Sequence, residues 1–219
     1  METIEGYHHI GLDRSTIPWD SSKSPAIKQM AEKTREYFEA HCRAWGREQL
    51  VSKNTSNSTR IHLLDEIFPE ARYVHIHRHP YSVIASLLNV GFWPGLDLWW
   101  SDKTPQQLQQ SGADPIEVAA EHWNRQIEAI LASAVTLPES RFLQLSYEDL
   151  VSSPETVCEK ISHFLDLKYS DEFRESIKNQ RVQTSSLDKW KQAAALERFV
   201  NANPKIASTA AALQYELPD

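Results

Sequence analysis

Two spacings of hydrophobic residues alternate along this chain, and together they indicate its fold class. Two short runs rich in β-forming residues, Tyr73–His77 and Phe142–Ser146, predict strands. Longer segments carry apolar residues at helical spacing and predict helices. These segments are residues 25–45, 60–68, 82–90, 115–135, 154–165, 171–178, 189–201 and 206–213. Strands that alternate with longer helices indicate an α/β protein, in which helices flank a parallel sheet.

Several single residues predict where these elements begin and end. Asp114 is expected to cap the long helix that starts at Pro115. Gly46 is expected to end the first helix, since glycine adopts the backbone conformation of a helix C-terminus at little cost. The apolar pair in Leu50–Lys53 predicts a short buried strand, and residues 1–24 are polar and rich in turn formers, which predicts irregular structure.

The connection between residues 91 and 112 is unusual because it is rich in tryptophan and glutamine. Phe92, Trp93, Trp99 and Trp100 fall within nine residues of each other. Long connections without regular structure are often binding loops, so these aromatic side chains could line a pocket for an apolar acceptor. The alternative is that they cover the long helix that follows, and the sequence leaves both interpretations open.

Composition and charge narrow the class of protein. The 219 residues, 41% hydrophobic and 24% charged, fit a single globular domain over 1–219. The formal net charge of −7 argues against a general nucleic-acid surface. Cys42 and Cys158 are expected to be thiols of a reducing compartment. No apolar run reaches the roughly 20 residues that span a bilayer, and the first residues do not resemble a secretory signal, so no membrane association and a cytoplasmic location are expected.

The segment ARYVHIHRHPYSVIASLLN, residues 71–89, carries the strongest chemical signal. A strand that ends near Arg78 and turns at Pro80 places a guanidinium at the carboxyl end of a sheet, where open α/β sheets bind ligands. Ser86 follows on the next helix, and a guanidinium backed by a hydroxyl suits a phosphate. An isolated arginine of this kind would more often only reach toward solvent, so the surrounding pattern decides between the two interpretations.

That pattern resembles the sulfotransferases that use 3′-phosphoadenosine 5′-phosphosulfate (PAPS) as sulfuryl donor. Residues 68–74, FPEARYV, are similar to the lead-in of the family's 3′-phosphate motif. A second segment follows in the expected order, with Leu145–Leu150 reading LSYEDL, then Pro154 and Phe164–Leu165. The resemblance covers about residues 50–195 and implies a sulfotransferase fold, which is related to that of P-loop NTPases.

The resemblance implies roles for four residues. Arg78 and Ser86 would bind the 3′-phosphate of PAPS or of its product adenosine 3′,5′-bisphosphate (PAP), and Tyr147 would contact the adenine side. Tyr147 could otherwise be a core tyrosine with a satisfied hydroxyl. Lys53 matches a family lysine whose ammonium neutralises charge on the bridging oxygen during transfer, which makes it the candidate catalytic residue.

The chain also departs from the family's pattern. No strand, Gly/Ser/Thr turn and helix that would bind the 5′-phosphosulfate precedes Lys53, so the resemblance implies an N-terminally truncated version of the fold. Residues Arg14–Thr16 are only weakly similar to that turn, because Ile17, Pro18 and Trp19 follow where a helix should begin. Cytosolic members carry a histidine general base two residues after the lysine, where this chain has Thr55, so the general base stays unassigned.

Other polar residues receive weaker expectations. Glu148 and Asp149 are expected to cap the following segment or to bind nearby backbone amides rather than to act in catalysis. His77 and His79 flank Arg78, so either could touch the nucleotide. The nine histidines show no spacing typical of metal ligands, and no metal is expected. Ser185, Ser186, Lys189 and Lys191 fall where the family's C-terminal segment approaches the 3′-phosphate.

Two functions therefore remain. The first is transfer of a sulfuryl group from PAPS to a hydroxyl or amine on a small molecule, glycan or peptide. The alternative is a truncated or degenerate relative that binds nucleotide or a protein partner without catalysis, and the missing phosphate loop supports it. A P-loop kinase would need a Gly-x-x-x-x-Gly-Lys element that this sequence lacks. A homodimer is also expected if the sheet leaves an edge exposed.

Overall fold

The computed structural model describes residues 25–180 and 194–217 of the chain. Predictions for residues 1–24 and for Ser185–Lys191 lie outside these residues. The chain forms two compact parts, and each is described by itself. Of the described residues, the first part contains 25–71 and 129–136, and the second contains 72–128, 137–180 and 194–217. The single domain expected over 1–219 stays a prediction.

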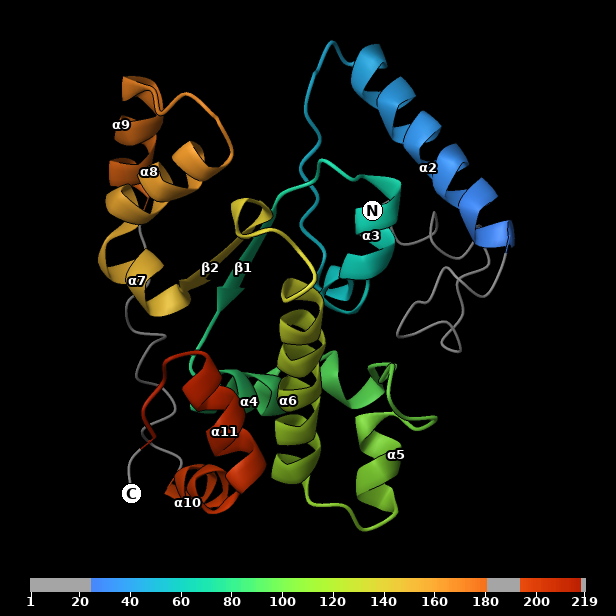
Figure 1. Ribbon diagram of the computed structural model, residues 1–219. Helices are drawn as coiled ribbons and strands as arrows, with labels where there is room; N and C mark the ends of the chain where they lie inside the picture. Colours follow the sequence, from blue (N-terminus) through green and yellow to red (C-terminus); the bar gives the residue numbers. More distant parts are fainter. Residues whose placement is uncertain (1–24, 181–193, 218–219) are drawn as a thin grey trace. The chain divides into compact units, whose positions relative to one another are not determined.

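The elements follow the expected alternation of strands and helices (Figure 1). The helices are α2 (Pro25–Ala44), α3 (Ile61–Ile67), α4 (Pro80–Asn89), α5 (Pro105–Gln110), α6 (Pro115–Ala134), α7 (Tyr147–Ser152), α8 (Pro154–Phe164), α9 (Asp171–Asn179), α10 (Ala194–Ala202) and α11 (Pro204–Ala212). The strands are β1 (Tyr73–His77) and β2 (Phe142–Ser146), and the short 3₁₀ helices are η3 (Thr55–Thr59), η4 (Trp93–Gly95) and η5 (Glu139–Arg141).

In the first part, α2 packs on α3. Ala31, Leu63 and Ile67 are buried together, with Phe68 packed against them. The Arg35 Nε atom donates a hydrogen bond of 2.7 Å to the Ile67 carbonyl, which satisfies a carbonyl at the end of α3. These apolar and polar contacts together fix the helix pair.

Two local expectations for the first part have opposite outcomes. Gly46 follows α2 with a φ of +59°, as expected of a residue that ends a helix. The strand expected at Leu50–Lys53 was wrong, because these four residues have no regular structure and are exposed, with Val51 82% exposed. Asn54 instead caps η3, where its side chain accepts a hydrogen bond from the Ser56 amide. Such local bonds from short polar side chains compete with strand pairing.

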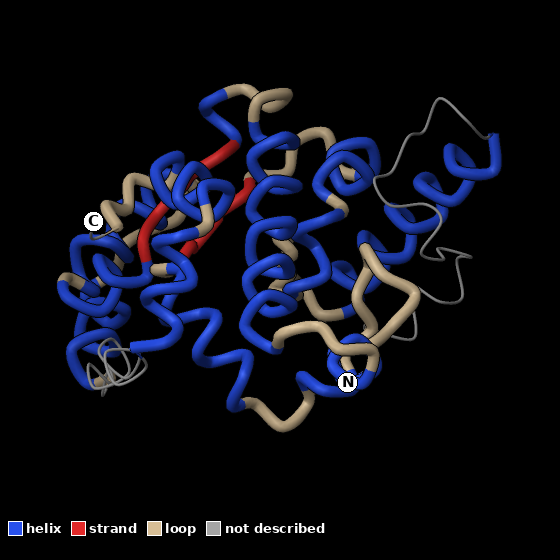
Figure 2. The backbone as a smooth tube through the Cα atoms, turned by 90° about the horizontal axis from the view of Figure 1, so that it is seen from below, coloured by secondary structure: helices blue, strands red, loops and turns tan. Residues whose placement is uncertain are grey.

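The second part contains the parallel strands that the sequence predicted. Within the described residues, β1 and β2 form a two-stranded sheet, and both have the expected bounds. The strands are paired in register from Tyr73 with Phe142 to His77 with Ser146 (Figure 2). Because the strands are parallel and in register, their carboxyl ends meet at one edge of the sheet.

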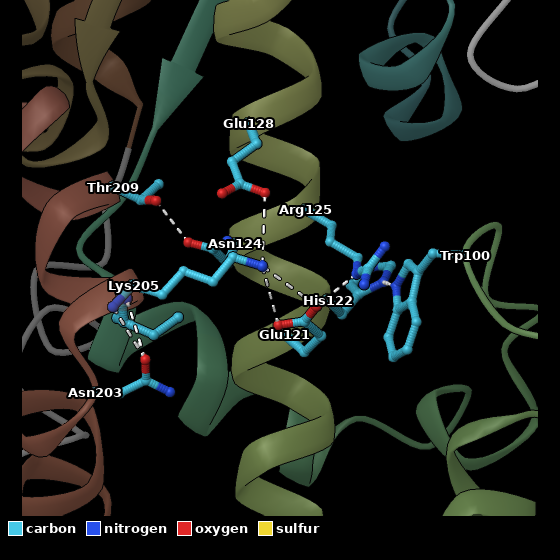
Figure 3. Close-up of polar contacts among 10 residues, drawn as sticks. Trp100, Glu121, His122, Asn124, Arg125, Glu128, Asn203, Lys205 and Thr209 are labelled. Carbon is cyan, nitrogen blue, oxygen red and sulfur yellow. Dashed lines mark hydrogen bonds and ion pairs between the residues drawn. The ribbon is translucent and has the colours of Figure 1, made fainter.

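The helices of the second part are joined by buried and partly buried contacts. α10 packs against α4 and α11, and the Tyr81 hydroxyl on α4 donates a hydrogen bond to Asn201 on α10. Thr209 on α11 donates a buried hydrogen bond of 2.5 Å to Asn124 on α6 (Figure 3). On α11, the Lys205 Nζ atom lies 3.4 Å from Glu121 Oε1 and 3.8 Å from Glu128 Oε2, both on α6.

The segment between residues 91 and 112 is more regular than expected, since it contains η4 and α5. Trp93 and Leu98 are buried. The Trp100 Nε1 atom donates a hydrogen bond of 3.3 Å to His122 on α6, and the Arg125 guanidinium stacks over the Trp100 ring at 5.1 Å (Figure 3). These contacts favour the interpretation that the tryptophans cover α6 rather than line an acceptor pocket.

The long helix begins as its sequence predicts. Asp114 Oδ1 accepts hydrogen bonds from the amides of Ile116 and Glu117, at 2.7 and 3.2 Å. These are amides that an uncapped helix would leave without a partner. The expected cap of α6 is therefore confirmed.

Candidate functional site

The candidate site begins at the carboxyl edge of the sheet, where both strands lead directly into helices. β1 ends at His77, and His79 is the N-cap of α4. β2 ends at Ser146, which is itself the N-cap of α7 and accepts a hydrogen bond of 3.0 Å from the Asp149 amide. Because His77 and Ser146 are partners in the sheet, the residues that follow them lie close together (Figure 1).

Arg78 and Tyr147 are brought together at this edge. The Arg78 Cζ atom lies over the Tyr147 ring, 4.8 Å from its centroid, and both side chains are half-buried. A guanidinium over an aromatic face is held by electrostatic attraction to the ring. Because each residue directly follows one of two paired strands, the sheet places Arg78 and Tyr147 side by side.

Glu148 connects the two loops that carry these residues. Its Oε1 atom accepts a hydrogen bond of 3.1 Å from the His79 amide. Its Oε2 atom accepts a hydrogen bond of 2.7 Å from the hydroxyl of Tyr215, a residue that follows α11. The expectation that Glu148 binds nearby backbone is therefore confirmed.

Tyr215 also contacts the histidines of β1 and α4. Its hydroxyl lies 3.0 Å from the Nδ1 atom of His77, a buried side chain. Its ring lies edge-on to the rings of His77 and His79, with centroid distances of 5.2 and 5.1 Å. Sequence reasoning missed Tyr215, since an aromatic residue after the last helix is consistent with many roles.

Burial controls the charge of the histidines at this edge. Burial lowers the pKa of His77 and of His79, although the nearby Glu148 carboxylate opposes the change in both. Burial, together with the neighbouring His77, lowers the pKa of His75 to about 4. Burial and the hydrogen bond to Glu148 raise the pKa of Tyr215. At neutral pH these rings are uncharged, and Arg78 supplies the permanent positive charge of the edge.

The other two predicted residues lie elsewhere. Ser86 is exposed on α4, in the second turn of this helix. Lys53 is exposed and belongs to the first part of the molecule. The structure thus brings Arg78 and Tyr147 together, and the roles of all four residues stay predictions.

The residues present fit a nucleotide phosphate through side chains. The first amides of α4 are already engaged, because the His79 amide donates to Glu148 and the Tyr81 amide donates to the His79 ring at 3.3 Å. An anion at this edge would therefore be held by Arg78, whose planar donors match a phosphate, with the Tyr147 ring available for stacking.

The described residues contain neither a candidate membrane span nor a candidate metal site. Among them, no helix has the length and apolar character needed to cross a membrane. No group of three or more His, Cys, Asp or Glu side chains in the described ranges is arranged to hold a metal ion.

Fold and site define an α/β protein that presents an arginine and an aromatic ring where parallel sheets bind their ligands. A model of the sulfotransferase family matches residues 14–171 of this chain. Because the match covers most of the sequence, the chain belongs to the sulfotransferase family. The match starts well before residue 50, where the resemblance was expected to begin, and stops before the expected residue 195.

Individual relatives agree with this assignment. Over 122 residues the chain is 30% identical to omega-hydroxy-beta-dihydromenaquinone-9 sulfotransferase Stf3 of Mycobacterium bovis. That match covers 55% of this chain and 29% of the relative, so the chain spans less than a third of the relative's length.

Solved structures show the same fold. The sulfotransferase domain from the curacin biosynthetic pathway matches 98% of this chain and 78% of its own, with a TM-score of 0.64 and 20% identity. The sulfotransferase domain of the Synechococcus PCC 7002 olefin synthase matches 98% and 81%, with a TM-score of 0.61 and 21% identity. The expected α/β sulfotransferase fold is therefore confirmed.

Proposed function

We propose that this protein binds PAPS at the carboxyl edge of its sheet and transfers the sulfuryl group to a hydroxyl or amine of an acceptor. The observation that carries the proposal is the Arg78 guanidinium over the Tyr147 ring, at the edge where β1 and β2 end. Membership of the sulfotransferase family supports the choice of donor. The acceptor is a small molecule, or a hydroxyl of a glycan or peptide.

Each predicted residue has a role in this proposal. Arg78 and Ser86 bind the 3′-phosphate, and Tyr147 stacks near the adenine. Lys53 neutralises the charge that develops on the phosphate oxygen as its bond to sulfur breaks and the acceptor oxygen or nitrogen bonds to sulfur. The acceptor's proton passes to a base that stays unassigned. Catalysis then rests on positioning and on charge stabilisation, as in phosphoryl transfer.

The first test is calorimetric titration of PAP into the wild-type protein and into Arg78→Ala. Loss of the charge-assisted hydrogen bonds to the 3′-phosphate should weaken binding by about 10- to 100-fold. The matched control is Arg174→Ala, because Arg174 also lies over a tyrosine ring, Tyr169, at 5.1 Å. The control should bind PAP like the wild type.

Two results would contradict the proposal. One is a folded wild-type protein that does not bind PAP, which would favour the alternative of a sulfotransferase-fold protein without catalysis. The other is an equal loss of affinity in both arginine variants, which would mean that stacked arginines support the fold in general.

A homodimer and a cytoplasmic location stay predictions.

The second test concerns Lys53. Lys53→Ala is expected to lower the rate of sulfuryl transfer from labelled PAPS, measured over a panel of hydroxyl and amine acceptors, on the order of 100-fold. PAP affinity should change less than in Arg78→Ala, since Lys53 acts on the transferring group. Lys33→Ala, which removes another exposed lysine of the first part, should keep the wild-type rate. An unchanged rate in Lys53→Ala would remove this residue from the mechanism.

A further inference from the structure

A chain of hydrogen bonds at the candidate site joins three segments that are far apart in the sequence. It runs from the His77 Nδ1 atom to the Tyr215 hydroxyl at 3.0 Å, and from this hydroxyl to Glu148 Oε2 at 2.7 Å. It then continues through Glu148 Oε1 to the His79 amide at 3.1 Å. The C-terminal segment is thereby attached to the same edge of the sheet as Arg78 and Tyr147.

The donors and acceptors in this chain fix the positions of its protons. An ionised Glu148 only accepts hydrogen bonds, so the Tyr215 hydroxyl must donate its single proton to Glu148. The Tyr215 oxygen can then only accept from His77, which therefore carries its proton on Nδ1. Burial lowers the pKa of His77, so the ring is neutral near pH 7 and its Nε2 atom is unprotonated.

The same bonds act on the residues proposed to bind the nucleotide. Glu148 follows Tyr147 in the chain, and His79 follows Arg78, so the bond from the His79 amide to Glu148 ties these two pairs together. Tyr215 restrains the carboxylate on its other oxygen. Without the Tyr215 hydroxyl, this oxygen would lose a hydrogen bond of 2.7 Å, and the carboxylate that holds the His79 amide would be less firmly oriented.

We propose that Tyr215 is a positioning residue of the nucleotide site, which acts through Glu148 to orient Arg78 and Tyr147. The inference rests on the proposed function, because it concerns the same site. It assigns a part of the site to the segment after α11, which none of the sequence motifs included.

Tyr215→Phe tests the inference because it removes one oxygen and keeps the ring between His77 and His79. PAP binding, measured by calorimetry, is expected to weaken about tenfold. Tyr169→Phe is the matched control, since the Tyr169 hydroxyl also donates a hydrogen bond, at 3.3 Å, to the Glu155 carbonyl. The control should bind PAP like the wild type. Wild-type affinity in Tyr215→Phe, with binding lost in Arg78→Ala, would overturn the positioning role alone.

A second readout needs no ligand. Nitrogen NMR of the histidine rings near pH 7.5 should show His77 with its proton on Nδ1 in the wild type. In Glu148→Gln the side-chain amide would donate to the Tyr215 oxygen, so the Tyr215 hydroxyl would donate to His77 and move the ring proton to Nε2. In Tyr215→Phe the Nδ1 preference should be lost.

The two readouts separate the possible failures. A wild-type His77 protonated on Nε2, or a tautomer unchanged in both variants, would overturn the hydrogen-bond chain whatever the ligand. A wild type with the expected tautomer but without PAP binding would overturn the proposed function, and with it the role of Tyr215 in nucleotide binding. A merely structural role for Tyr215 would lower the stability of Tyr215→Phe and leave its PAP affinity at the wild-type value.

Discussion

The side chain of His122 lies against two tryptophans of the segment that precedes α6. Its Nδ1 atom accepts a hydrogen bond from Trp100 (Figure 3). The Trp93 ring lies edge-on to the His122 ring, with a centroid distance of 5.3 Å. An acceptor Nδ1 requires a ring that is neutral and protonated on Nε2. Burial lowers the pKa of His122 to about 4, which is consistent with this state. His122 thus joins the tryptophan segment to α6 through a hydrogen bond that protonation of its Nδ1 atom would break.

This arrangement predicts a loss of stability in acid. A histidine in the unfolded chain has a pKa near 6.5, while that of His122 in the folded protein is about 4, so the unfolded state binds a proton first as the pH falls. The stabilisation is complete above about pH 6.5 and is lost progressively toward pH 4. Between about pH 7.5 and about pH 4.5 this one residue should cost on the order of 2 kcal/mol of unfolding free energy.

Urea unfolding of His122→Gln at these two pH values checks the prediction. The variant should lose less stability on acidification than the wild type, because its amide does not titrate and can still accept from Trp100. His163→Gln, which replaces an exposed histidine of α8, should keep the wild-type pH dependence. Equal losses in the wild type and in His122→Gln would assign the acid sensitivity to other groups, such as the half-buried His75.

At the scale of elements, local sequence determined the strands well. Tyr73–His77 and Phe142–Ser146 have the bounds that their β-forming residues predict. The similar apolar pair at Leu50 and Val51 does not form a strand, because a strand is stabilised by pairing and packing that a local sequence does not reveal.

The helix boundaries follow from capping residues, and the sequence analysis overlooked the capping residues of α5. The helix expected from residue 82 begins at Pro80, because proline suits the first turn and the His79 side chain caps the helix. The segment 91–112 was treated as irregular, yet Thr104 and Gln107 form a capping box with Pro105 between them. This pattern of Thr with Gln three residues later predicts a helix start, so α5 could have been found from sequence.

In the candidate site, too, contacts set by neighbouring sequence could be predicted, and contacts between distant segments could not. The proximity of Arg78 to Tyr147 follows from two parallel strands that end together. The contacts of Tyr215 with Glu148 and His77 join residues separated by 67 and 138 positions. No spacing in a single sequence encodes such contacts, because they depend on how α10 and α11 pack against the rest of the second part.

At the scale of the whole molecule, one helix belongs to both compact parts. Residues 115–128 of α6 lie in the second part, while residues 129–134 lie in the first. Unfolding of the second part would remove the helix that supplies residues 129–134 to the first part. Because one helix contributes residues to both parts, whether the two parts unfold together is open to a direct test, and the single domain expected over 1–219 stays a prediction.

The two cysteines provide separate probes of this cooperativity. Cys42 lies in the first part and Cys158 in the second, and both are free thiols with intermediate exposure. Burial raises the pKa of the Cys158 thiol, which slows its reaction with thiol reagents in the folded protein. The reactivity of each thiol should therefore increase as its own part of the molecule unfolds.

Thiol labelling across a urea series, in Cys42→Ser and in Cys158→Ser, measures the two parts independently. If the shared helix α6 makes unfolding cooperative, both remaining thiols should become reactive at the same urea midpoint. The fluorescence of the buried Trp93 and Trp123 should change at that midpoint as well. Circular dichroism of both variants controls for destabilisation by the substitutions. If Cys42 reacted at much lower urea than Cys158, the first part would unfold alone, and the chain would consist of two domains despite the continuous helix.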